Sequence, residues 1–422
     1  MSTGRTYVEP AKELPVYGEY DVIIVGGGAA GFAAAVAAAR NGAKTLIIER
    51  FPFFGGTATA AIMPQINGFR NEREPDGLQT TRGIGEEVIL RLKELGGLGI
   101  TTHNKQKVYP TAPGQLSFSY GVDTEKLKYV MLKMVTEAGA EVLFHTYFCD
   151  VIREGRRVVG VIWENKSGRQ AAYAKVIIDA SGDGDVAIRA GAAYWQTVHD
   201  EAPRLIDILI YKVAGLPNEH HVHGAGVYSA PCLWGPKAGP INAVDARELT
   251  DAEIRTRLAV YEDLKARKAH DPQLADAEIV ETGPMLGIRQ TRFIEGLYKI
   301  TAEDVLGGAR FEDSMAMASK PIIHYYGYRR FLEHEGYEIP YRCMLPKDVD
   351  GMLVAGRCMS SDQPAFESWR SIGPCMCLGQ AAGTSAALCA RAGVEPKQVD
   401  IKALQRTLIE QGAEIGQGRR RE

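Results

Sequence analysis

The sequence predicts an α/β protein in which a parallel sheet, extended by a small β-meander, is joined to an inserted α+β domain. Short β-branched runs break into glycine-rich turns at residues 20–31, 176–185 and 352–356. Helical segments rich in small residues follow the first and last of these turns. Such uninterrupted apolar runs are typical of strands that are buried on both faces of a parallel sheet. At about 150 residues per domain, a chain of 422 residues has room for two or three domains.

Composition and charge exclude several classes of protein. With 45% hydrophobic and 24% charged residues, this is an ordinary globular sequence and not a disordered, collagen-like or coiled-coil one. A net charge of −3 argues against nucleic acid as a partner. The seven scattered cysteines form no disulfide framework. Because residues 1–20 contain no apolar leader, we expect reduced thiols and a cytoplasmic location.

Three uncharged stretches, at residues 22–39, 51–69 and 371–390, approach the length that spans a bilayer. They are dominated by Gly, Ala, Ser and Thr, which partition only weakly into hydrocarbon. We therefore expect no membrane span, and we interpret these small residues as places where the backbone approaches a ligand or another helix.

The first motif is a strand, a glycine-rich turn, a helix, a second strand and an acid, in that order. The segments are Tyr20–Val25, Gly26–Gly31, Phe32–Arg40, Lys44–Ile48 and finally Glu49. A G-x-G-x-x-G pattern alone is a weak indication, but this complete order predicts a dinucleotide-binding βαβ unit. The positive end of the helix dipole and its free N–H groups suit a pyrophosphate.

Each special residue of this motif has a physical task. Gly26 permits the tight turn, Gly28 lets a pyrophosphate approach the backbone, and Gly31 lets the helix pack closely against the strand. Glu49 lies 18 positions after Gly31, near the spacing of an acid that binds ribose hydroxyls. A ribose with a free 2′-hydroxyl favours FAD or NAD over NADP.

Two distant segments extend the pattern. Val176–Asp185 reads as a strand that ends in a Gly-rich acidic turn, and Met352–Arg357 is another strand ending in glycine, followed by an uncharged helix at Gly373–Gly383. On these residues the chain resembles FAD-dependent oxidoreductases of the glutathione-reductase-like superfamily, in the branch with an ID-A-(S/T)-GDGD turn and a GR…GQAAG tail. The resemblance covers most of the chain and implies FAD held by distant segments. No second G-x-G-x-x-G follows a strand, so a separate NAD(P)H domain is not evident.

The resemblance implies a Rossmann-like FAD-binding domain that is discontinuous. We expect an N-terminal arm at residues 1–18, the FAD domain at 19–198 and 346–422, and a substrate or cap domain at 199–345. Together with the first motif, it assigns cofactor contacts to Gly26, Gly28, Ala29, Ala30, Gly31, Glu49, Arg50, Gly55, Gly56, Thr57, Phe148, Ala180, Ser181, Gly182, Asp183, Gly356, Arg357, Gly373, Gln380, Ala381 and Gly383. Many relatives carry Asp at the position of Arg357, so the contact made there is expected to differ or to fall to Asp183.

Further elements fill these two domains. Apolar spacing predicts a helix at Thr124–Ala138, and short strands at Glu141–Thr146, Phe148–Arg153 and Val158–Trp163 predict the meander. In the cap, Thr250–Lys268 reads as a charged surface helix that begins with a capping box of Thr250 and Glu253. We expect residues 224–244, which are rich in Gly and Pro, to form a long loop or a lid.

Candidate catalytic residues are His324, Arg289, Arg292 and Tyr341. The resemblance places the segment of His324 near the flavin, where a neutral imidazole takes up a substrate proton; a core histidine is the alternative. The two arginines suit a carboxylate clamp, with structural ion pairing as the alternative. By resemblance, Ser361, Asp362, Ser368 and Arg370 lie near the flavin ring, and a mutual ion pair of Asp362 with Arg370 is the alternative.

Metal and thiol chemistry are not expected. The three histidines of residues 220–223 lie in a Pro/Gly-rich loop without a fourth ligand, so we expect no metal site. Cys375 and Cys377 are spaced C-x-C on a helix, which turns their side chains apart, so we expect packing residues and not a redox pair.

The function expected from these features is an FAD-dependent dehydrogenase or oxidase that moves a hydride between a small organic metabolite and flavin N5. The alternatives are an NAD(P)H-dependent flavin reductase or monooxygenase, and a complex subunit in which FAD is structural. The substrate stays unidentified, as does the electron acceptor, for which oxygen, a quinone, ferredoxin or another flavoprotein would fit. A homo-oligomer is a reasonable expectation for an enzyme of this size.

Overall fold

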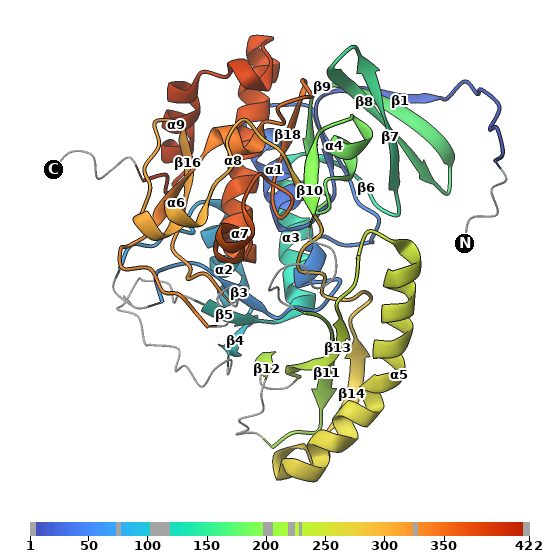
Figure 1. The fold of residues 1–422 in the computed structure, drawn as a ribbon, viewed down its shortest axis with the longest axis vertical. Coiled ribbons are helices and arrows are strands. Elements are labelled where there is room, and N and C mark those ends of the chain that lie inside the picture. The colour runs from blue at the N-terminus through green and yellow to red at the C-terminus, as the bar shows by residue number, and fades with distance from the viewer. Residues whose placement is uncertain are drawn as a thin grey trace.

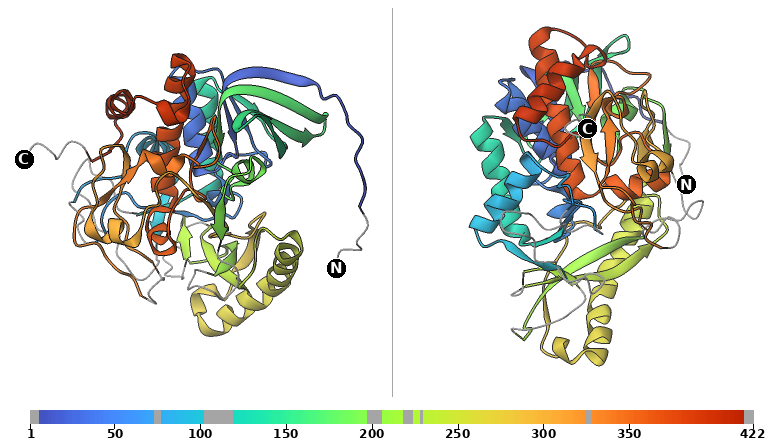
Figure 2. Two further views of the ribbon diagram at one scale, coloured as in Figure 1. Left: turned by 45° about the horizontal axis from the view of Figure 1, so that its top comes forward. Right: turned by 90° about the vertical axis from the view of Figure 1, so that its left-hand side faces the viewer.

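The computed structural model describes residues 6–72, 77–101, 119–196, 206–217, 224–227, 230–323 and 328–416. It has the predicted α/β class. A first sheet with its helices forms the larger body, and a second sheet with one long helix lies against its lower side (Figures 1 and 2). The interface between these two bodies positions the functional site.

The first sheet is built on parallel strands. Its order is β6–β2–β1–β9, with bounds Glu141–Leu143, Thr45–Ile48, Val16–Val25 and Gly168–Asp179, and β18 (Met352–Val354) also pairs with β9. All four of these pairings are parallel. In β1, alternate residues enter different core clusters, so both faces are buried and the continuous apolar run is explained.

The meander extends the same sheet beyond β9. Strands β7 (Tyr147–Glu154) and β8 (Arg157–Asn165) are antiparallel, and β8 pairs with the first half of β9. The predicted membership was wrong at one point, because β6 belongs at the opposite edge of the sheet beside β2. The sequence of a three-residue strand does not indicate which strand it pairs with. The pairing of β6 with β2 depends on contacts between distant segments of the folded chain.

Helices α1 (Ala29–Arg40) and α8 (Ile372–Ala392) lie side by side on the first sheet (Figure 1). Their approach is as close as backbone allows. A Cβ on Gly379 would lie 2.0 Å from the carbonyl oxygen of Ala30, and one on Gly383 would lie 2.2 Å from that of Ala34. The small residues of both helices are therefore packing residues, and no helix among the described residues is long and apolar enough to cross a membrane.

The second sheet is antiparallel and gathers strands from distant parts of the chain. Its order is β14 (Glu278–Thr282), β11 (Asp207–Ala214), β13 (Cys232–Gly239), β12 (Gly224–Gly226), β4 (Leu98–Thr101), β5 (Ser119–Val122) and β3 (Gln65–Asn67). Helix α5 (Ala246–His270) packs on β11 and β13. The sheet thus combines strands from before and after residue 198.

Two local predictions in this region were wrong. Helix α5 begins four residues before the predicted capping box: its N-cap is Asp245, whose carboxylate accepts from the backbone N–H groups of Arg247 and Glu248. The hydroxyl of Thr250 instead donates to Ala246 O within the helix. The segment at 224–244 contains β12 and β13 in place of a continuous loop.

Shorter elements complete the described chain. The α-helices are α2 (Ile84–Glu94), α3 (Thr124–Ala138), α4 (Asp185–Arg189), α6 (Ala302–Gly307), α7 (Gln363–Trp369) and α9 (Ile401–Glu410). Two-stranded sheets are formed by β10 (Tyr194–Gln196) with β15 (Arg292–Ile294), and by β16 (Ser314–Ala318) with β17 (Tyr337–Pro340). The bounds of α3 agree with the predicted helix.

The α1–α8 contact leads to a stability prediction. We expect Gly383→Ala to lower the free energy of unfolding by about 1–3 kcal/mol, because its Cβ would overlap a backbone oxygen. Gly307→Ala in α6 is the matched control, since a Cβ there meets no described atom within 4 Å and Ala favours a helix. Denaturant unfolding of both variants measures the difference. A Gly383→Ala protein as stable as the unsubstituted one would contradict the proposed contact.

Candidate active site

A cavity of about 940 Å³ opens where the parallel strands end. Val25, Ile48, Ala180 and Ala355, which end or directly follow β1, β2, β9 and β18, all line it. Residues of the second sheet and of the segment after β14 close the other side. In open α/β sheets, ligands bind at this carboxyl edge.

The N-terminus of α1 faces this cavity and is open to a ligand. Gly28 is its N-cap, no described side chain caps it, and Gly28, Ala29 and Ala30 line the cavity. Among the described residues, a Cβ placed on Gly28 would have only the Cα of Gly56 within 4 Å, at 4.0 Å. Free N–H groups beside an open glycine surface fit the pyrophosphate of a dinucleotide.

The other two glycines of the motif have the packing roles expected of them. Gly26 has φ +96°, and a Cβ there would lie 2.6 Å from Ala180 O. A Cβ on Gly31 would lie 1.8 Å from Gly26 O. The turn is therefore closed behind the cavity, and Gly31 does not line it.

Glu49 lies at the end of β2 with a buried carboxylate. It accepts hydrogen bonds from the backbone N–H groups of Gly27 at 2.6 Å and Phe51 at 2.9 Å. Burial raises its pKa, and these two hydrogen bonds oppose that rise. The carboxylate lines the cavity beside the glycine turn, which is the position from which an acid accepts from ribose hydroxyls.

The acidic turn after β9 is held by Asp179, the last residue of that strand. The buried carboxylate of Asp179 accepts from the N–H and hydroxyl of Ser181 and from the N–H of Ala187. Burial and the charges of Asp183 and Asp179 raise the pKa of Asp185 to about 6. This turn brings Ser181, Gly182 and Asp183 to the cavity wall.

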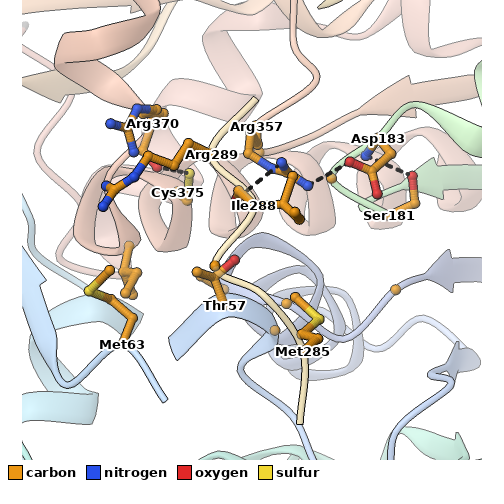
Figure 3. A pocket seen from close by; sticks show the side chains of 18 of the residues that line it. Thr57, Met63, Ser181, Asp183, Met285, Ile288, Arg289, Arg357, Arg370 and Cys375 are labelled. Atoms are coloured by element: carbon orange, nitrogen blue, oxygen red, sulfur yellow. Dashed lines mark hydrogen bonds and ion pairs between the residues drawn. The ribbon is translucent and has the colours of Figure 1, made fainter. Parts of the chain in front are cut away.

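Arg357, the departure from the family pattern, pairs with this turn. Its guanidinium donates to Asp183 at 2.6 Å and to the carbonyl oxygen of Ile288 at 3.2 Å (Figure 3). Asp183 also accepts from the hydroxyl of Thr291. The three segments that meet here are thereby tied together at the middle of the cavity.

The opposite end of the cavity is cationic. Arg289, Lys320 and Arg370 line it, and Figure 3 shows Arg289 and Arg370 beside each other with Met63 across the cavity. The Nζ of Lys320 donates to Ser371 Oγ at 2.7 Å. We refer to Arg289, Lys320, Arg370 and Ser371 as the cationic end.

Helix α8 begins at this end. Ser371 is its N-cap, but the hydroxyl accepts from Lys320, no described side chain caps the helix, and its first turn holds no acid. Ser371, Ile372 and Cys375 line the cavity. Two helix N-termini, those of α1 and α8, thus open into one cavity.

Lys320 was missed by sequence reasoning, although it is the most perturbed cation of the site. It is 4% exposed, and no described carboxylate pairs with it. Burial, together with the charges of Arg370 and Arg329, lowers its pKa to about 7. A lysine inside the apolar run before Pro321 was the available indication, since lysine is rarely buried without a function.

Most of the predicted site residues lie on the cavity wall. These are Gly26, Gly28, Ala29, Ala30, Glu49, Arg50, Gly55, Gly56, Thr57, Phe148, Ala180, Ser181, Gly182, Asp183, Arg289, Gly356 and Arg357. The structure does not bring Gly31, Gly373, Gln380, Ala381, Gly383, Arg292 or Tyr341 to it.

The residues off the wall have structural partners. Gln380 Oε1 accepts from the N–H of Ile84 at the start of α2. The hydroxyl of Tyr341 is bonded to Ser385 Oγ and donates to Pro396 O, deep in the core. Arg292 forms an ion pair with Asp185 at 3.1 Å, which was the structural alternative.

In the segment before α8, which contains α7, only Arg370 of the four predicted residues reaches the cavity. The alternative, an ion pair between Asp362 and Arg370, does not form either: Arg370 pairs with Glu367 at 2.8 Å, and Asp362 caps α7 by accepting from Ala365 N. Cys375 lines the cavity, but burial raises its pKa to about 12, so it is a thiol at neutral pH.

His324 and the histidines of residues 220–223 lie outside the described residues. Within the described ranges, no group of three or more His, Cys, Asp or Glu side chains is arranged to hold a metal ion.

A comparison with models of known families identifies the family of the chain. A family model described as FAD dependent oxidoreductase matches residues 21–228 and 210–408. Among solved structures, a geranylgeranyl bacteriochlorophyll reductase-like protein from Thermoplasma acidophilum is 15% identical, with coverage of 93% of this chain and 83% of that one and a TM-score of 0.48. A myxobacterial chondrochloren halogenase is 18% identical over 92% of this chain and 78% of that one, with a TM-score of 0.48. A flavoprotein/dehydrogenase from Cytophaga hutchinsonii is 12% identical over 93% and 84%, also at 0.48.

The position of Glu49 leads to a test of cofactor binding. We expect Glu49→Gln to weaken FAD binding by about 10- to 100-fold, since a hydrogen bond to a charged group contributes about 1.5–3 kcal/mol. Titration of the apoprotein with FAD, followed by flavin fluorescence, measures this. Asp21→Asn is the control, because Asp21 pairs with Lys175 away from the cavity. Equal affinities in the two variants would remove Glu49 from the ribose site.

Proposed function

The chain belongs to the FAD-dependent oxidoreductase family and uses FAD, and from this premise we propose that it is a dehydrogenase or oxidase of a small organic molecule. When bound, FAD supplies a hydride acceptor at flavin N5. What the chain itself must add is a place for the substrate and a group that takes up the substrate's second hydrogen as a proton.

The fit of the cavity to FAD is the first support. The uncapped N-terminus of α1 and the open surface of Gly28 would hold the pyrophosphate, and Glu49 would accept from the adenosine ribose. The N-terminus of α8 would face the flavin ring at the cationic end. Both sets of donors come from backbone, which is rigid and carries its partial charge without a counter-ion.

Lys320 is the observation that carries the proposal. Its amine is buried at the cationic end, it donates only to Ser371 Oγ among the described residues, and its pKa of about 7 leaves it largely neutral above pH 7. A neutral amine accepts a proton. Lys320 Nζ would therefore take up the O–H or N–H proton of the substrate, while bound FAD would supply the acceptor for the hydride of the C–H bond, which leaves a C=O or C=N bond in the product.

The proposal is tested by anaerobic mixing of the FAD-loaded protein with alcohols, amines and hydroxy acids. We expect a substrate to bleach the absorption band of oxidised flavin with two electrons per FAD. Bleaching by NAD(P)H alone would overturn the direction of the reaction and favour a reductase or monooxygenase.

The lowered pKa of Lys320 predicts that the rate of flavin reduction depends on pH. A lysine acts as a base only above its pKa, so we expect the rate of flavin reduction to rise with pH through about 7 and then to level off. Lys320→Met should lower that rate by about 10²- to 10⁴-fold and remove the limb near pH 7. Lys402→Met, on the exposed side of α9, is the control. A pH limb that persists in Lys320→Met would assign the proton transfer to another group.

A further inference from the structure

The cationic end collects positive charge from three separate segments. Burial, together with the charge of Arg370, lowers the pKa of Arg289 to about 10, and the charge of Arg370 also contributes to the lowered pKa of Lys320. Arg289, Lys320 and Arg370 are therefore close enough to repel one another inside a partly desolvated cavity. Such an arrangement is costly unless negative charge compensates it.

The described acids compensate only part of this charge. Arg370 donates through Nε and Nη2 to Glu367, at 3.2 and 2.8 Å. Arg329, which also lines the cavity, donates to Glu72 at 2.5 Å. Both of these guanidinium groups thus have a carboxylate of their own.

Among the residues that the structure describes, Arg289 has no such partner. Its Nε donates to Ile206 O at 3.1 Å, and the carboxylate of Asp207 accepts from its backbone N–H. Its two terminal nitrogens donate to none of the residues that the structure describes, and no ion pair forms there. Figure 3 shows its guanidinium extending toward the end of the cavity beside Arg370.

Charge balance at this end indicates what is missing. Two guanidinium groups are paired with carboxylates, and Lys320 is largely neutral above pH 7. Among the described residues, the guanidinium of Arg289 is therefore the cation at this end that no carboxylate contacts, and the charge of Asp207, which accepts from the Arg289 backbone N–H, offsets it only in part. The planar guanidinium fork matches the two oxygens of a carboxylate. Met63 and Ile323 supply apolar wall nearby, which suits a small organic acid better than a phosphate dianion.

We propose that Arg289 binds the carboxylate of the substrate, so that the enzyme oxidises a small carboxylic acid that carries an alcohol or amine. This inference rests on the proposed function, since it names the substrate class of the same site. The carboxylate is not consumed: it orients the substrate so that the C–H bond faces the flavin and the O–H or N–H faces Lys320.

The test uses the FAD-loaded protein and non-oxidisable probes, so that it does not depend on turnover. Benzoate and benzamide have the same ring and differ in charge, and inorganic phosphate supplies a different anion. We expect benzoate to perturb the visible flavin spectrum in a saturable titration and benzamide to bind at least 10-fold more weakly. Equal binding of benzoate and benzamide would overturn the proposal, and so would tighter binding of phosphate than of benzoate.

Variants then assign the carboxylate to Arg289. Arg289→Gln should weaken benzoate binding by at least 10-fold while FAD content and affinity stay unchanged, and Arg289→Lys should restore part of it because the charge returns without the fork. Arg247→Gln, at the exposed start of α5, is the control. A loss of FAD affinity in Arg289→Gln with unchanged benzoate binding would assign Arg289 to the cofactor and overturn the inference.

The two proposals fail differently. Benzoate binding that depends on Arg289, without flavin bleaching by any hydroxy or amino acid, would keep the carboxylate site and reject the dehydrogenase. Bleaching by uncharged alcohols or amines, with no effect of Arg289→Gln on their apparent affinity, would keep the dehydrogenase and reject the carboxylate site.

Discussion

The contact between α1 and α8 is the constraint on which the rest of the structure depends. Gly379 and Gly383 place the backbone of α8 against the carbonyl oxygens of Ala30 and Ala34, closer than any side chain allows. These helices come from opposite ends of the chain, so the contact brings the C-terminal part of the protein onto the N-terminal βαβ unit. As a result, the N-termini of both helices open into one cavity. The glycines of the GQAAG tail serve this packing and do not themselves line the cavity.

Elements with a complete local pattern could be predicted from the sequence. Helix α3 has an apolar stripe, Asp123 as N-cap and Gly139 in the left-handed conformation as C-cap, and its predicted bounds agree with the structure. The βαβ unit is as clear, because β1, the glycine turn, α1 and β2 follow one another directly. In both cases the determining interactions lie within one turn or one short unit of the chain.

The remainder depends on contacts between distant segments, which a single sequence does not record. The short β6 lies at the parallel edge because it pairs with β2. Strands β3, β4 and β5 belong to the second sheet because β4 pairs with β12, from beyond residue 206. The cationic end is of the same kind. Arg289, Lys320 and Arg370 come from three segments without a common motif. Their spacing in the sequence therefore does not indicate that they line the same cavity. Arg292, three residues from Arg289, faces Asp185 instead.

The two ends of the cavity differ in the charge of the side chains that line them. At one end, the Glu49 carboxylate lies beside the glycine turn, and at the other, Arg289 and Lys320 lie beside the N-terminus of α8. Ribose hydroxyls need an acceptor, whereas negative charge on a reduced flavin ring is stabilised by cations and by a helix N-terminus. A dinucleotide that satisfies both requirements would lie with its adenosine at Glu49 and its flavin at α8. On the proposed function, a substrate would then meet the flavin at the cationic end. The side chains that select it would belong to the three segments outside the motifs, so the motifs alone leave its identity open.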